Sequence, residues 1–289
     1  MGPAHDPSAH EPSAAEPTAR IDPRHARSWL LLSAAAPEQF DDAVSGPADA
    51  VILDLEDAVP DAGKAKARSD VVEWLSSGGR AWVRINDATT GFWHEDLDAL
   101  AGAIGLEGVV LAKTESGQQV DATTGRIPGA ARVIALVESA MGLEAAPEIA
   151  RADATFRLAF GTGDFRRDTG TDDSPLAMAY PRARLTITSR AARLPGPIDG
   201  PTVTSGREDV ARDARVTVSL GMTGKLCMNS AQAPPVNEAL SPSVADTLWA
   251  HEVIARLGDD GRNITQGSDR PALAEAKKIS ARARMFGIG

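Results

Sequence analysis

From residue 27 onward, short apolar runs alternate along the chain with longer amphipathic stretches. Apolar runs of about four to eight residues are typical of strands buried on both faces, and the stretches between them carry apolar residues at helical spacing. The alternation predicts repeated strand–helix units around a parallel sheet. The eight runs expected to form strands are 28–33, 50–54, 81–85, 108–113, 132–138, 157–161, 197–203 and 225–228.

This number of strand–helix units favours a closed barrel over an open sheet. Eight units over roughly 250 residues match a (β/α)8 TIM barrel, whereas an open doubly wound sheet usually has about five or six strands. An open sheet often also carries a glycine-rich phosphate loop after its first strand, and residues 33–37 (SAAAP) contain no glycine. The helices expected around the barrel are 62–75, 95–104, 142–152, 175–193 and 207–220.

Two flanking segments differ from the barrel in composition. Residues 1–26 carry five prolines among small and charged residues, so we expect a disordered tail there. The barrel, as the catalytic domain, spans 27–240. Residues 241–289 are expected to form a C-terminal helical appendage, with helices near 242–257 and 271–285, that covers the site or packs on a neighbouring subunit.

Composition narrows the class of protein. Forty acidic and thirty basic side chains give a net charge of -10, which repels phosphate backbones, so we expect no nucleic-acid partner. No apolar window approaches the length of a membrane span and no secretory signal begins the chain, so no membrane association is expected. The single cysteine, Cys227, allows neither an intrachain disulfide nor a cysteine-based zinc site, and these features indicate a cytoplasmic protein.

Ionisable and amide side chains gather where the predicted strands end. The active site of a barrel is built at the carboxyl ends of its strands, so these residues should meet at one mouth. They are Asp54, Glu56 and Asp57 at the end of the second run, Arg84 and Asn86 at the third, Lys113 at the fourth, Glu138 at the fifth and Asp164 after the sixth.

Glu138 and Asp164 follow consecutive strands, so their carboxylates should be neighbours. Two like charges without a histidine or cysteine partner call for a hard divalent cation, and Mg²⁺ accepts one or two carboxylates with water and substrate oxygens completing its octahedron. In the alternative interpretation each carboxylate caps a following helix or pairs with Arg84 or Lys113. Spacing alone leaves both interpretations open.

Arg84 has two interpretations as well. Its planar guanidinium suits a carboxylate or a polarised carbonyl oxygen of a substrate, and Asn86 adds a neutral donor. The alternative is a salt bridge to Glu56 or Asp57. A Ser/His/Asp hydrolase is not indicated, because the chain has no Gly-x-Ser-x-Gly elbow.

Several motifs together resemble a known family. They are 27–30 (RSWL), 51–59 (VILDLEDAV), 64–68 (KAKAR), 83–86 (VRIN), 112–116 (AKTES), 135–142 (ALVESAMG) and 197–200 (PIDG). In this order they resemble the citrate lyase β-subunit-like branch of the HpcH/HpaI aldolase superfamily, over residues 27–286.

The resemblance implies a (β/α)8 barrel assembled as a homotrimer or hexamer. It also implies an enzyme that uses Mg²⁺ to make or break a carbon–carbon bond in acyl-CoA 3-hydroxy acids. Its metal ligands would be Glu138 and Asp164, and Arg84 would hold the keto acid, with Asn86 and Lys113 also binding substrate. Glu56 would be a supporting or acid/base carboxylate. Asp269, in the sequence Asp-Arg-Pro, would act as acid/base in the site of an adjacent subunit.

Three departures from the family pattern bear on the substrate. Residues 228–232 (MNSAQ) stand where the family usually has Ile-His-Pro-x-Gln, Gly163 replaces a glutamate, and residues 267–268 (GS) replace an apolar pair. We expect a Mg²⁺-dependent lyase acting on a short 3-hydroxyacyl-CoA such as malyl-CoA or citramalyl-CoA. The alternatives are a CoA-independent aldolase for a pyruvate-derived or specialised-metabolite substrate and a non-catalytic binding protein on the same barrel.

Overall fold

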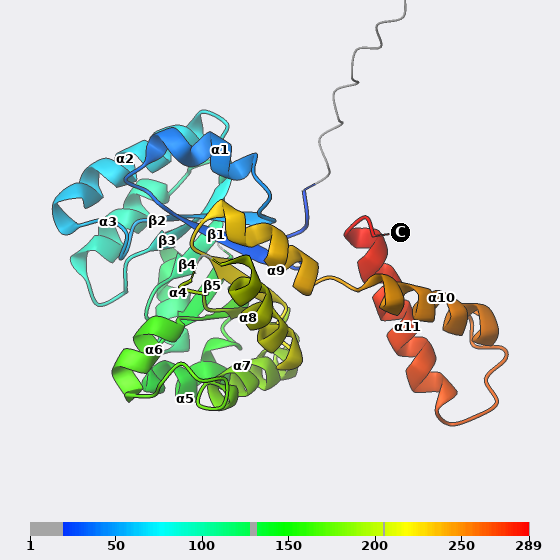
Figure 1. Ribbon diagram of the computed structural model, residues 1–289. Coiled ribbons are helices and arrows are strands. Elements are labelled where there is room, and N and C mark those ends of the chain that lie inside the picture. Colours follow the sequence, from blue (N-terminus) through cyan, green and yellow to red (C-terminus); the bar gives the residue numbers. More distant parts are fainter. Residues whose placement is uncertain (1–19, 128–131, 205, 289) are drawn as a thin grey trace, which may run out of the picture.

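The predicted barrel is confirmed. The computed structural model describes residues 20–127, 132–204 and 206–288. Eight parallel strands close a ring in chain order, with helices outside it (Figure 1). The strands are β1 (Ser28–Ser33), β2 (Ala50–Asp54), β3 (Ala81–Ile85), β4 (Leu106–Leu111), β5 (Val133–Val137), β6 (Thr155–Phe160), β7 (Ile198–Asp199) and β8 (Gly224–Cys227).

The long helices lie close to their predicted positions. These are α2 (Asp61–Ser76), α3 (Gly91–Leu100), α5 (Ala140–Ile149), α7 (Ala179–Ala191), α8 (Arg207–Ser219), α10 (Val244–Leu257) and α11 (Asp269–Met285). Other helical segments were not predicted, because they are short or carry few apolar residues. They are η1 (Pro37–Gln39), α1 (Phe40–Val44), α4 (Gly117–Arg126), α6 (Thr162–Thr169), η2 (Ser230–Gln232) and α9 (Ala233–Ala239).

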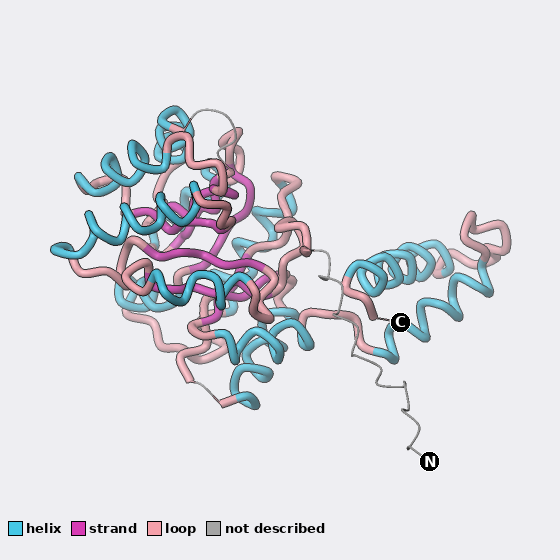
Figure 2. The backbone as a smooth tube through the Cα atoms, turned by 90° about the horizontal axis from the view of Figure 1, so that it is seen from above, coloured by secondary structure: helices cyan, strands magenta, loops and turns pink. Residues whose placement is uncertain are grey.

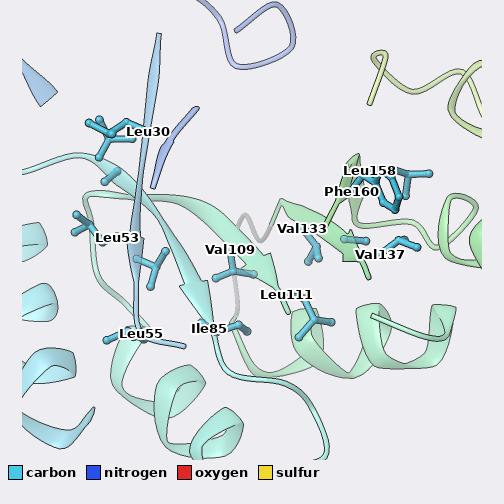
Figure 3. Close-up of a cluster of buried hydrophobic side chains, with 14 of the residues drawn as sticks. Leu30, Leu53, Leu55, Ile85, Val109, Leu111, Val133, Val137, Leu158 and Phe160 are labelled. Atoms are coloured by element: carbon cyan, nitrogen blue, oxygen red, sulfur yellow. The ribbon is translucent and has the colours of Figure 1, made fainter. Parts of the chain in front are cut away.

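Strand side chains alternate between two apolar cores. One set points outward against the helices and forms the larger core, part of which is shown in Figure 3. The other set fills the inside of the barrel and includes Ile52, Trp82, Leu136 and Leu226. Because side chains alternate along a strand, the residue two positions beyond an inward apolar residue also points inward.

That alternation positions the site. Asp54, Arg84 and Glu138 each stand two residues beyond an inward-facing apolar residue of their strand. They therefore form the last inward layer at the carboxyl ends of β2, β3 and β5. All three are buried, with 0%, 8% and 5% exposure respectively.

Strand β7 is much shorter than the predicted run 197–203. Only Ile198 and Asp199 pair with neighbouring strands. Beyond Asp199, the backbone carbonyl groups that would pair in a longer strand accept hydrogen bonds from side chains instead. Lys225 Nζ donates to Gly200 O, and Gln232 Nε2 donates to Thr202 O. The chain leaves the sheet at that point.

The expected disordered tail needs a correction at its end. Residues 20–26 lie against the floor of the barrel, whereas residues 1–19 fall outside the described part of the chain. The fully buried Arg157 guanidinium donates to Pro23 O and Ala26 O, and Trp29 Nε1 also donates to Ala26 O. A buried arginine needs such acceptors, so it fixes this segment in place.

Helices α10 and α11 form an antiparallel hairpin that stands off the barrel (Figures 1 and 2). They share a small apolar core of their own. At the barrel end of the hairpin, Arg282 donates to Leu240 O and the Phe286 ring stacks under Arg27, with 4.0 Å from guanidinium to ring centre. No helix in the described part of the chain is long and apolar enough to cross a bilayer.

Candidate active site

A cavity of about 480 Å³ opens at the carboxyl ends of the strands. Asp54, Arg84, Glu138 and Asp164 give it a charged wall, and inward residues such as Leu136 give it an apolar floor. We call it the mouth cavity. These four charged residues are distant in sequence, and the barrel brings them together.

Arg84 is fixed by a carboxylate on the neighbouring strand. Asp54 and Arg84 are direct partners in the β2–β3 register, so their side chains leave the sheet side by side. Arg84 Nε and Nη2 each donate to one Asp54 oxygen at 2.6 Å, and Nη1 lies 3.1 Å from Glu56 Oε2. The sequence interpretation of a salt bridge thus holds for Glu56. The principal partner is Asp54, which the sequence placed at the mouth but did not pair with Arg84.

The charge of Arg84 is secure. Burial alone would lower its pKa, but the hydrogen bonds and charge of Asp54, with Glu56 and Glu138 nearby, raise the pKa above its ordinary value. A guanidinium has five N–H groups, so these contacts leave donors free for a ligand in the mouth cavity.

Glu138 is a buried carboxylate with little local compensation. Its Oε1 accepts a hydrogen bond from Lys113 N at 2.7 Å. Its pKa is raised to about 8, chiefly by burial; the charges of Glu56 and Asp164 add to this rise, while the Lys113 hydrogen bond and the charge of Arg84 oppose it. A bound cation would relieve this cost of ionisation.

Asp164 lies in the first turn of α6 rather than at a strand end. Its Oδ1 pairs with Arg167 Nη1 at 2.6 Å, across one helical turn. The exposed Arg167 makes this a weak pair that a stronger ligand can displace. Asp164 and Glu138 nevertheless line the same cavity, and the charge of Asp164 reaches Glu138.

A glycine makes room for the Glu138 carboxylate. A Cβ at Gly161 would collide with Glu138 Oε2, whereas a Cβ at Gly163 would meet nothing within 4 Å. In the described residues no third Asp, Glu, His or Cys completes a metal-binding cluster with this pair. Two carboxylates are enough for Mg²⁺, which keeps several waters or substrate oxygens, so the donor set fits that ion.

Lys113 joins two of these carboxylates. Its φ of +46° is unusual for a residue with a side chain. In this conformation its N–H bonds Glu138, while Nζ bonds Glu56 Oε1 at 2.5 Å. Burial raises the pKa of Glu56, and Arg84 and Lys113 oppose that effect. Neither Glu56 nor Lys113 lines the mouth cavity; both line a neighbouring cavity with Asn86.

Asn86 is not brought to the mouth cavity. Its Nδ2 donates to Asp96 Oδ2 at 2.7 Å and to Leu55 O, and its backbone N–H also bonds Asp96. Asp96, fully buried on α3, is held in turn by Arg68. The structure therefore shows Asn86 as part of a buried polar cluster that fixes the end of β3.

Asp269 is distant from the mouth in its own chain. It is the first residue of α11, and the preceding loop 258–268 lies at the end of the hairpin away from the barrel (Figure 1). Its carboxylate accepts from Thr265 N and Gln266 N and pairs with Arg256 at 3.3 Å. Those backbone hydrogen bonds, with Arg256, hold its pKa below the ordinary value. Its acid/base role remains a prediction that requires a second subunit.

Comparison with known proteins agrees with this architecture. Residues 27–230 match the HpcH/HpaI aldolase/citrate lyase family, and residues 245–287 match the HpcH/HpaI aldolase C-terminal domain. A citrate lyase subunit beta-like protein of Mycobacterium tuberculosis is 35% identical over 269 residues, which cover 88% of this chain and 94% of that protein.

Two further comparisons concern ligands and activity. The crystal structure of M. tuberculosis CitE in complex with magnesium, acetoacetate and coenzyme A has a TM-score of 0.76 and 31% identity, covering 90% of this chain and 99% of that one. An L-malyl-CoA/beta-methylmalyl-CoA lyase of Cereibacter sphaeroides is 26% identical over 306 residues, covering 91% and 96%. The chain belongs to the HpcH/HpaI aldolase/citrate lyase family.

Proposed function

We propose that the protein is a Mg²⁺-dependent carbon–carbon lyase that acts on a short 3-hydroxyacyl-CoA such as malyl-CoA or citramalyl-CoA. The observation that carries the proposal is Glu138, a buried carboxylate with its pKa near 8, which lines one cavity with Asp164 and Arg84. The malyl-CoA lyase relative and the CitE complex with magnesium and coenzyme A support the choice of metal and thioester.

In this proposal the acidic and basic residues of the mouth have different roles. Glu138 and Asp164 would hold Mg²⁺, which would supply a Lewis acid for the oxygens of the keto acid. Arg84 lies on the same cavity and would donate to the keto-acid oxygen, which carries negative charge after the hydroxyl loses its proton and before the carbon–carbon bond breaks. Glu56 and Lys113 keep Arg84 and Glu138 in position.

Cleavage needs a base for the substrate hydroxyl. The carboxylate takes the hydroxyl proton, the carbon–carbon bond breaks, and its electron pair passes to the α-carbon of the thioester as an enolate. That carbon then takes up one proton, so the reaction consumes no net proton. Malyl-CoA would give glyoxylate and acetyl-CoA; citramalyl-CoA would give pyruvate and acetyl-CoA. We assign the base to Asp269 of an adjacent subunit, with Glu56 as the candidate if Asp269 is dispensable.

A homo-oligomer, as a trimer or hexamer, is part of this proposal. Asp269 is the first residue of α11, and the end of the hairpin at which α11 begins lies away from the barrel (Figure 1), as in an arm toward a neighbour. Its α10 helix also exposes Val244, Leu248 and Trp249, with 67%, 59% and 40% exposure. An exposed apolar helix face of this kind supports packing against another subunit.

The test is product analysis with a panel of 3-hydroxyacyl-CoA thioesters. We expect Mg²⁺-dependent cleavage of at least one thioester, detected by mass spectrometry of the keto acid and acyl-CoA, and its loss in EDTA. Glu138→Ala and Asp164→Ala should fold but lose the Mg²⁺-dependent rise in melting temperature. A wild-type rise in both variants would remove these residues from the metal site.

One feature favours the CoA-independent aldolase as a second candidate. Met228, at the altered end of β8, lines the mouth cavity, so the departure from the family pattern lies at the substrate. Cleavage of free hydroxy acids, with every thioester left intact, would select this second function. Failure with both substrate classes would favour the non-catalytic alternative.

A further inference from the structure

A second cavity lies beside the mouth and belongs to no part of the proposed mechanism. Its volume is about 380 Å³, and it lies between α6, the segment before α7 and the loop after β7. Thr162 and Pro201 line both this cavity and the mouth cavity, so the two are neighbours across a thin wall. We call it the side cavity.

Two buried donors line the side cavity without a full set of acceptors. Thr202 is 5% exposed, and its hydroxyl oxygen has no hydrogen-bond partner in the described residues. Lys225 is 2% exposed and bonds Gly200 O at 2.7 Å, although an ammonium has three N–H groups. Buried polar groups normally have partners, so these two indicate a missing acceptor.

The charges around these donors leave a positive balance. Lys225 and Arg182 share one carboxylate, Asp199, at 3.7 and 2.8 Å. Asp199 also accepts from Thr217 Oγ1, so its capacity is largely used. Burial alone would raise the pKa of Asp199, but Lys225 and Arg182 hold it below the ordinary value, so the carboxylate stays ionised. Two cations therefore face one anion in the interior. Over the whole side cavity four cations, Arg166, Arg182, Arg212 and Lys225, stand with three carboxylates, Asp173, Asp199 and Asp213.

The rim adds movable cations. Arg166 lies 3.6 Å from Asp173, which is 81% exposed, and Arg212 pairs with Asp209 at the surface. Such exposed ion pairs contribute little free energy, so either guanidinium can turn to a ligand at small cost. The Arg166 Nε hydrogen is also without an acceptor in the described residues.

The wall of the cavity is built before any ligand arrives. Gln232 Nε2 donates to Thr202 O and Thr204 O, and its Oε1 accepts from Met228 N. These bonds fasten the loop after β7 to the end of β8. A Cβ at Gly200 would collide with Thr162, which shows how closely this loop meets α6. A preformed wall lowers the entropy cost of binding.

We propose that the side cavity is a second binding site, which takes an anionic ligand through phosphate or carboxylate oxygens. The ligand would accept from Thr202 Oγ1 and Lys225 Nζ, the former after rotation of χ1, and from Arg166 or Arg182 at the opening. The proposal does not depend on the lyase activity, because none of these groups touches the metal ligands.

The experiment is calorimetric titration of the full chain with inorganic pyrophosphate and with malonate, in EDTA, so that the metal site takes no part. We expect saturable binding of at least one probe. Thr202→Val keeps the shape of the side chain and removes its hydroxyl. It should weaken binding of the probe about tenfold or more, because the variant lacks a hydrogen bond to a charged group. Its melting temperature should not fall, since an unpartnered hydroxyl is lost.

Two further variants keep the test decisive. Arg166→Gln should also weaken binding of the probe. Arg207→Gln is the control and should leave binding unchanged, because Arg207 is an exposed arginine of α8 that pairs with Glu238 outside the cavity. No saturable binding of either probe would overturn the proposal. So would binding that survives Thr202→Val and Arg166→Gln but is lost in Arg84→Lys, because the anion would then lie in the mouth cavity.

Competition with coenzyme A distinguishes the two sources of such an anion. If coenzyme A displaces the probe from the wild-type protein, the side cavity takes the phosphates of a thioester substrate. If the probe stays bound in the presence of coenzyme A, the site takes a separate small anion. Both results support the site, and neither requires the lyase assay to succeed.

Discussion

The barrel mouth and the tip of the C-terminal hairpin each hold a predicted functional carboxylate, but in opposite states. Glu138 is buried with a single backbone hydrogen bond, and its pKa is raised to about 8. Asp269 accepts two backbone hydrogen bonds and an arginine, and its pKa is lowered. The ionised form of Glu138 would be stabilised by a bound cation, whereas the ionised form of Asp269 is already stabilised by hydrogen bonds from its own loop.

The arginine partners of the two regions differ in the same way. Arg84 is buried and binds Asp54 through two parallel hydrogen bonds, while Arg256 is 61% exposed and makes one long contact to Asp269. Burial removes competing water, so the mouth pair has one geometry, whereas the hairpin pair is screened by solvent. The comparison shows charged groups held in one geometry within the barrel and, at the hairpin tip, a carboxylate whose arginine partner is open to solvent.

The largest expected effect comes from making the same substitution in both regions. Arg84→Lys should lower kcat/KM by about a thousandfold, because lysine keeps the charge but loses the planar fork. Arg256→Lys should stay within about threefold of wild type, since an exposed pair contributes little. Steady-state kinetics on the cleaved thioester measure both. Equal losses would show that the two arginines do not differ in function.

A hundredfold effect is expected at the hairpin tip. Asp269→Asn should lower kcat by about a hundredfold, the usual contribution of a positioned acid/base, while Mg²⁺ and keto-acid binding remain. Because Asp269 also holds its own loop, Arg256→Gln serves as the control that loosens the loop and keeps the carboxylate. If Arg256→Gln loses as much activity as Asp269→Asn, the role of Asp269 is folding.

Subunit mixing tests whether Asp269 acts in the neighbouring site. Oligomers that combine Asp269→Asn with Glu138→Ala, formed by reversible dissociation, should recover part of the activity, because some interfaces pair an intact metal site with an intact Asp269. Verified mixed oligomers without activity would contradict the shared site. Full activity of Asp269→Asn alone would transfer the acid/base role to Glu56.

A smaller effect is expected from two glycines of the mouth. Gly161→Ala should weaken Mg²⁺ binding about tenfold, because the new Cβ would displace the Glu138 carboxylate. Changes in the groups that position a metal ligand commonly lower metal affinity by about this factor. Backbone strain is not the reason, since φ of Gly161 is -85°. Gly163→Ala has open space and should bind Mg²⁺ as the wild type does. Calorimetric titration with Mg²⁺ compares the two, and equal affinities would contradict the assigned position of Glu138.

The smallest effect concerns Lys113. Lys113→Met should weaken keto-acid binding by a few-fold to about tenfold, because it removes one of the two cations beside Glu56 and leaves that charge to Arg84 alone. Mg²⁺ affinity should change little, since the backbone N–H to Glu138 remains. If Lys113 acts through Glu56, the Lys113→Met/Glu56→Gln double variant should be no worse than Lys113→Met. Additive losses would instead indicate direct contact with the substrate, as the sequence interpretation held.

The sequence by itself determined the barrel and the position of its charged mouth. Both depend on short-range patterns: apolar runs of strand length, helical spacing between them, and polar residues where the runs end. Strand alternation is also local: once the structure shows that Trp82 and Leu136 point inward, Arg84 and Glu138, two residues later, must point inward too. The ordered motifs indicated the family before any contact was known.

Only the tertiary structure decided which groups meet. The register of β2 against β3 places Asp54 beside Arg84 as its partner. The side chain of Asn86 bonds the buried Asp96 of α3 and therefore does not line the mouth cavity. Contacts distant in sequence likewise shortened β7, through Lys225 and Gln232, and fixed residues 20–26 through Arg157. The physical reason is that a hydrogen bond between distant residues depends on strand register and packing, which no single segment of the sequence encodes.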